Sequence, residues 1–159
     1  MKRSFSLKLF MMTLTLLVGT LAVAATELPF SASGRGVAAF VFDGAGNVIG
    51  ADVAGAGHAT HLGNFTNSGR ILFGAPDPNN PTIIPTSGDG ILTAANGDKL
   101  YIVVEDGVTD VTTGIGTGKF RFNGGTGRFV NATGITSYVV EQSFLTGGYE
   151  VTLVGNIDY

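Results

Sequence analysis

The sequence predicts an all-β protein, namely a single antiparallel barrel of about eight strands, with a two-sheet β-sandwich as the alternative. Short runs of alternating apolar and polar residues are separated by Gly, Asn and Asp, and no apolar stripe with helical spacing follows residue 25. Glycine is abundant, with 25 residues, whereas only five prolines occur. The barrel is favoured over the sandwich because closure removes the exposed strand edges that invite aggregation.

Residues 1–25 have the order of a secretory signal peptide. Positive charges between Lys2 and Lys8 precede an apolar run, which ends in the small residues Ala22 to Ala25. We therefore predict cleavage after Ala24 or Ala25 and a secreted protein, either periplasmic or extracellular. An uncleaved membrane anchor is the alternative, but the apolar run is a little short for a span and is interrupted by Gly and Thr.

The remaining segment, residues 26–159, is expected to fold as one acidic domain. Three of the nine basic residues lie in the leader and all twelve carboxylates follow it, so this domain carries six bases against twelve acids, net −6. Nucleic acids and anionic lipids are bound chiefly by clustered Lys and Arg, so we expect neither nucleic acid nor, after cleavage, a membrane as partner. We predict no cofactor and no metal; the absence of cysteine excludes thiol nucleophiles and cysteine-ligated metal centres.

The first half of the domain is expected to supply three or more strands. Val37 to Phe42 alternates and ends at the turn residues Asp43 to Asn47. Val48 to Thr66 is threaded with glycines, which predicts one strongly bent strand or two strands meeting at a corner. Arg70 to Gly74 is predicted to be a short strand.

Ala75 to Gly88 interrupts this pattern with four of the five prolines. Because proline cannot donate a hydrogen bond to a sheet, we expect an exposed loop here. A long irregular loop in a compact domain is a candidate contact for a partner.

Hairpins follow. Ile91 to Ala95 and Leu100 to Glu105 flank Asn96-Gly97, the preferred pair for a type I′ turn. In Val111 to Phe122 one face carries glycines and phenylalanines and the other carries Lys119 and Arg121, which predicts the inside and outside of a curved sheet. Ile135 to Leu145 and Tyr149 to Tyr159 form the last predicted hairpin.

Phe120 to Gly134 joins two of these strands through a glycine-rich corner, Asn123 to Gly127. Gly124-Gly125-Thr126-Gly127-Arg128-Phe129, with Ala132 and Gly134, resembles the GGTG-x-F-x-x-A-x-G corner of the dirigent proteins and the allene oxide cyclases, which share an eight-stranded barrel. Ala59 to Gly63 and Thr93 to Asp98 resemble uncharacterised secreted bacterial members of that group. The resemblance implies a barrel with a possible ligand cavity. It implies no reaction, because no catalytic residue of either family aligns here, and the lack of cysteine departs from the cyclase pattern.

Other motifs are explained by turns or by core packing. His58 and His61 would lie on opposite faces of a regular strand, so a shared zinc ion is not expected. The glycine corner lacks the lysine and the helix of a phosphate-binding loop. The aromatic residues either fill the core, which we favour, or line a cavity for an apolar ligand; the candidates are Phe40, Phe42, Phe120, Phe122, Phe129, Tyr138 and Phe144.

The function expected from these features is non-catalytic: binding of a small apolar ligand or a protein partner, or a structural role. The alternative is a barrel enzyme, a cyclase, isomerase or dirigent-like protein that acts on a small apolar substrate by confining it. An internal cavity with polar groups at one end is the feature that would keep the enzyme alternative, and a solid interior would remove it. Oligomeric state stays open.

Overall fold

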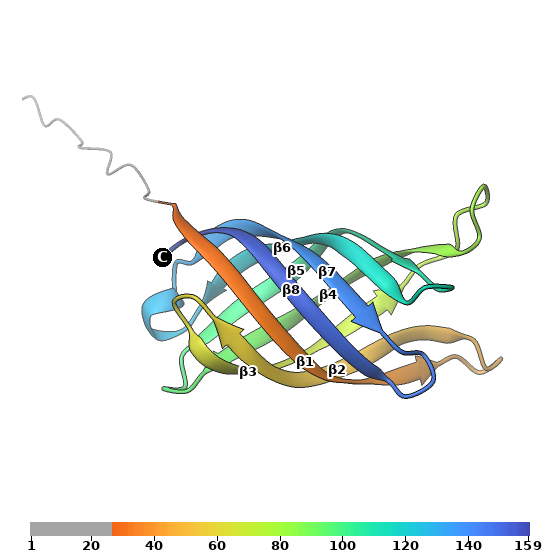
Figure 1. Ribbon diagram of the computed structural model, residues 1–159, viewed down its shortest axis with the longest axis horizontal. Coiled ribbons are helices and arrows are strands. Elements are labelled where there is room, and N and C mark those ends of the chain that lie inside the picture. Colours follow the sequence, from red (N-terminus) through yellow and green to blue (C-terminus); the bar gives the residue numbers. More distant parts are fainter. Residues whose placement is uncertain (1–26) are drawn as a thin grey trace, which may run out of the picture.

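The computed structural model describes residues 27–159, which form a closed barrel of eight antiparallel strands (Figure 1). Each strand pairs with its neighbours in the chain, and β8 pairs with β1 to close the barrel. The strands are β1 (Leu28–Phe42), β2 (Val48–Ala59), β3 (Gly63–Phe73), β4 (Ile83–Ala94), β5 (Lys99–Asp110), β6 (Ile115–Gly125), β7 (Thr133–Gln142) and β8 (Gly148–Asp158). The predicted barrel is therefore confirmed, and the sandwich alternative is wrong. The predicted leader lies outside the described residues.

Side chains alternate between the interior and the solvent along every strand. In β6 Gly116, Gly118, Phe120 and Phe122 point inward, whereas Thr117 and Lys119 are exposed, as the sequence predicted. An eight-stranded barrel leaves an interior just wide enough for side chains to fill or for one small ligand. The size of the inward residues therefore decides which of these applies.

The strand boundaries in the first half differ from the prediction. β1 begins at Leu28, well before the predicted start at Val37. The sequence did not indicate this start because the inward positions before Val37 include Gly34 and Gly36, which give no apolar signal. The segment Val48 to Thr66 is two strands rather than one bent strand, and Arg70 to Gly74 is not a separate strand but the end of β3.

The proline-rich loop is shorter than predicted. Only residues 74–82 leave the barrel, and Ile83 to Gly88 belong to β4. Pro85 lies within that strand, where its carbonyl oxygen accepts a hydrogen bond from the Gly74 amide at 2.9 Å. The strand tolerates this proline because a register shift follows directly, between Thr86 and Gly88.

Two turns have a different geometry from the one expected. Only Gly97 of the Asn-Gly pair has a positive φ (89°), so the turn is not type I′; Gly97 donates to Ala94, and Ala94 donates to Asp98, in a three-residue loop. β6 begins only at Ile115. The preceding turn forms because the Asp110 carboxylate accepts hydrogen bonds from the amide and hydroxyl of Thr112, at 2.8 and 2.7 Å.

The glycine-rich corner bends sharply, as predicted. Gly124 and Gly127 have φ values of 74° and 57°, and a short 3₁₀ turn, Gly127–Phe129, follows. This turn swings Phe129 into the end of the barrel, where its side chain is completely buried. The part of the chain that the structure describes has no helix long and apolar enough to cross a membrane.

Candidate functional site

The barrel interior is packed solid at the end that holds the glycine-rich corner. The largest side chains there are at most 2% exposed. The rings of Phe30 and Phe122 meet edge to face, with centroids 4.9 Å apart. The fully buried apolar residues at this closed end are Phe30, Leu100, Phe122, Phe129 and Ile157.

The other half of the interior, toward the β1–β2 and β7–β8 hairpins, contains a cavity of about 120 Å³. Small inward residues on four consecutive strands create it: Ala38 on β1, Ala51 on β2, Gly69 on β3 and Gly90 on β4. Pockets for drug-sized ligands measure about 300–1,000 Å³, whereas an apolar cavity of about 150 Å³ is known to hold benzene. This cavity is therefore of a size for a single small ring.

One wall of the cavity is aromatic. The rings of Phe120 and Tyr138 stack with centroids 4.5 Å apart and an interplanar angle of 19°. Gly118 makes room for this arrangement, since a Cβ atom there would lie 2.9 Å from the Tyr138 ring. The glycine-bearing face of β6 thus serves to seat a neighbouring aromatic side chain.

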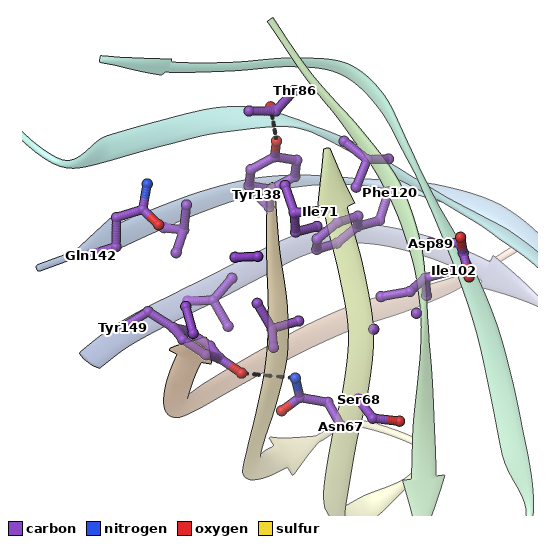
Figure 2. A pocket seen from close by; sticks show the side chains of 18 of the residues that line it. Asn67, Ser68, Ile71, Thr86, Asp89, Ile102, Phe120, Tyr138, Gln142 and Tyr149 are labelled. Atoms are coloured by element: carbon purple, nitrogen blue, oxygen red, sulfur yellow. Dashed lines mark hydrogen bonds between the residues drawn. The ribbon is translucent and has the colours of Figure 1, made fainter. Parts of the chain in front are cut away.

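The opposite wall carries a polar pair, Asn67 from β3 and Tyr149 from β8 (Figure 2). The Asn67 amide nitrogen donates to the Tyr149 hydroxyl at 2.8 Å. Tyr149 lies over Gly36 and Gly55, where a Cβ atom on either would come within 2.7 Å of its hydroxyl oxygen. Burial raises the pKa of Tyr149, and the hydrogen bond from Asn67 offsets only part of this shift, so the hydroxyl stays protonated at neutral pH.

A second pair, Thr86 and Tyr138, is looser. Their hydroxyl oxygens are 3.5 Å apart, which is the outer limit for a hydrogen bond. Burial raises the pKa of Tyr138 as well, and the contact with Thr86 offsets only part of this shift. Both tyrosines are therefore neutral hydrogen-bonding groups (Figure 2). The cavity lining also includes the polar side chains of Thr109 and Gln142.

No charged side chain occupies an inward strand position among residues 27–159. Asp89 borders the cavity, but it is exposed and is paired in register with Arg70 on the outer surface of β3 and β4. Arg70 in turn forms an ion pair with Asp52. Any ligand that enters the cavity meets hydroxyl groups, amides and hydrocarbon.

The structure separates the aromatic residues that the sequence grouped together. Phe120 and Tyr138 line the cavity, whereas Phe122 lies in the packed end. Phe40 and Phe144 stack on each other, with centroids 5.6 Å apart, outside the cavity lining. Phe42 is 58% exposed.

Sequence reasoning missed Asn67, Thr86 and Tyr149 as cavity residues. The available signal was alternation: Asn67 shares a face of β3 with Phe65 and Gly69, so a polar side chain on a buried face was visible in the sequence. That signal was hidden because the segment from Val48 was not divided correctly into strands.

The two histidines contact different residues. His58 is hydrogen-bonded to Asn64 through Nδ1 at 3.2 Å, and Nε2 of His61 lies 3.0 Å from the Pro29 carbonyl oxygen. Among the described residues no group of three or more His, Cys, Asp or Glu side chains could hold a metal ion.

Comparisons with known proteins give a likeness in structure only. No family model matches the sequence, and no curated protein matches it. The chain is similar to a solved structure described as that of the pterocarpan synthase dirigent protein GePTS1, with 14% identity, a TM-score of 0.47 and 84% of each chain covered. The likeness concerns the fold alone and assigns no residue and no activity to this chain.

Proposed function

We propose that the barrel binds a small, mostly apolar molecule in the cavity at its hollow end. The observation that carries this proposal is the hollow itself, since the same barrel is packed solid at its other end. A void forfeits the dispersion contacts of its lining atoms, and a ligand of matching size restores them. The Asn67–Tyr149 pair adds a fixed polar point that orients the ligand.

The cyclase-like or dirigent-like enzyme remains the second candidate, and the same polar pair favours it, because polar groups at one end of a cavity can orient a substrate. Among residues 27–159 the inward side chains offer hydroxyl and amide groups but no carboxylate and no base; Asp89 borders the cavity from an exposed position. Catalysis here would therefore rest on confinement and orientation rather than on proton transfer. Incubation with a bound candidate molecule separates the two candidates: a binding protein returns it unchanged, and an enzyme returns an isomer.

The binding proposal is tested with methylenecyclopentane, an apolar ring close in size to the cavity. Titration followed by amide NMR is expected to shift resonances of cavity residues such as Ile71 and Val140 in a saturable way. Ile71→Phe fills the cavity and should abolish saturable binding.

The matched control is Leu72→Phe, the next residue of β3, which is 50% exposed on the outer face and should leave binding intact. If wild-type protein shows no saturable shifts, or if the two variants bind equally, the cavity is not a binding site.

We also propose that the protein is exported. This rests on the leader expected at residues 1–25. The mass of the protein isolated from its own host is expected to match a chain that begins at Ala25 or Thr26. A full-length mass would contradict export by cleavage.

A further inference from the structure

We infer that the ligand of the cavity is a neutral carbonyl compound with a single small ring, bound with its carbonyl oxygen at Tyr149 and Asn67. This inference rests on the proposed function and adds the chemical class of the ligand. Three properties of the cavity carry it: the absence of charged side chains at inward positions of the described strands, the free donors of one polar pair, and the aromatic wall.

The lack of charge excludes ionic ligands. A carboxylate or ammonium group loses its hydration on entering the barrel, and the cost is several kcal/mol unless a counter-ion is present. The inward positions of the described strands carry no Lys, Arg, Asp or Glu; Asp89 borders the cavity but is exposed, and the ion pair of Arg70 with Asp52 lies on the outer surface. The site therefore selects neutral molecules.

The Asn67–Tyr149 pair has hydrogen-bond donors to spare. The Tyr149 oxygen accepts from the Asn67 amide, so its own hydrogen is free, and no further hydrogen bond of either side chain occurs among the described residues. If the amide is turned over, Tyr149 donates to the Asn67 oxygen, and both amide hydrogens become free. Either arrangement leaves donors at the cavity wall, and a carbonyl oxygen with two lone pairs satisfies them.

The aromatic wall is the reason for assigning a ring to the ligand. Phe120 and Tyr138 present stacked, nearly parallel rings on the side of the cavity away from Tyr149 (Figure 2). A flat or slightly puckered ring packs against such a surface while its polar substituent points at Asn67. The volume of about 120 Å³ limits the ligand to about one ring.

The test compares two probes of one size, cyclopentanone and methylenecyclopentane, and adds the larger cyclopentanecarboxylate at pH 7 as a charged probe. The first two differ only in the group that would face Tyr149, a carbonyl or a methylidene group of the same shape. Dissociation constants from NMR titration of the full mature chain are the readout. We expect cyclopentanone to bind about five- to tenfold more tightly than methylenecyclopentane, the amount one or two buried hydrogen bonds supply. We expect no binding of the carboxylate.

Two variants test which hydroxyl group causes the preference for cyclopentanone. Tyr149→Phe keeps the ring that packs over Gly36 and Gly55 but removes the hydroxyl, so it should reduce the preference for cyclopentanone about fivefold and leave methylenecyclopentane binding unchanged. Tyr138→Phe is the control: it removes a hydroxyl from the opposite wall and should keep the preference. Thermal unfolding of both variants verifies that they are folded.

The outcomes separate this inference from the proposed function. If methylenecyclopentane binds as tightly as cyclopentanone, or if the carboxylate binds, the assignment of a neutral carbonyl ligand is wrong while the cavity remains a binding site. If Tyr149→Phe and Tyr138→Phe behave alike, the assignment of the carbonyl to Tyr149 is wrong. If no probe binds to the wild-type protein, the proposed function falls and this inference falls with it.

Discussion

The two halves of the barrel interior are enclosed by the same eight strands, but one half is filled by side chains and the other contains a cavity. At the closed end Phe129, Phe30 and Phe122 fill the space between the strands, and Phe129 is delivered by the glycine-rich corner. At the hollow end the inward positions of β1 to β4 include Ala38 and Ala51, and a cavity results. The strand topology therefore does not determine where a ligand fits. The size of the inward side chains determines it.

The largest effect on stability is expected from removing the Phe129 side chain at the closed end. Phe129→Ala should lower the free energy of unfolding by about 3–5 kcal/mol, because Phe129 is fully buried and its ring packs 5.1 Å from that of Tyr159. Urea unfolding measures this. Phe144→Ala, at the other end, is the matched control; this residue is 37% exposed and stacks only on Phe40, so its loss should cost about 0.5–1.5 kcal/mol. Equal losses would contradict the distinction between the two ends.

The next effect concerns the glycines on which aromatic side chains lie. A Cβ atom at Gly57 would fall 2.2 Å from the Ser33 carbonyl oxygen and 2.7 Å from the Phe65 ring, so Gly57→Ala should cost about 1–3 kcal/mol. Gly44→Ala provides the comparison, since a Cβ atom there meets nothing within 4 Å. Denaturant midpoints of the two variants give the difference. An unchanged midpoint for Gly57→Ala would mean that the glycine-lined interior is looser than described.

A smaller effect of opposite sign is expected at Thr136. Its hydroxyl is completely buried and has no hydrogen-bond partner, which costs free energy that valine of the same shape does not lose. Thr136→Val should therefore stabilise the barrel by about 1 kcal/mol. Thr86→Val serves as the reference, because that hydroxyl lies 3.5 Å from the Tyr138 hydroxyl and its removal should bring no gain. A loss of stability in Thr136→Val would reveal a partner for this hydroxyl.

The smallest effect is a dependence of stability on alkaline pH. Well below pH 10 Tyr138 and Tyr149 are protonated in both the folded and the unfolded chain, so they contribute no slope. Burial raises the pKa values of Tyr138 and Tyr149 in the folded barrel, so above pH 10 the unfolded chain releases these protons first and stability falls. Urea midpoints between pH 9 and 11 should decline less in the Tyr138→Phe, Tyr149→Phe double variant than in the wild type.

The sequence predicted the closed barrel because alternation, glycine turns and the corner are local signals. It predicted the inward face of β6 and of β8 for the same reason. It did not predict the start of β1, where inward glycines carry no hydrophobic signal, or the strand that contains Pro85, which depends on a bulge. The resemblance implied a ligand cavity, and Phe120 and Tyr138 were named for it, but its polar pair could not be predicted, because Asn67 and Tyr149 are 82 positions apart and meet only once the barrel has closed.

Xenon binding tests the central claim most directly, because xenon enters apolar cavities regardless of any ligand chemistry. A crystal of the mature protein under xenon pressure is expected to show one internal site, against Ile71, Phe120 and Tyr138, with none beside Phe129. A hollow end without xenon, or a site between Phe30 and Phe122 in the closed end, would contradict the account.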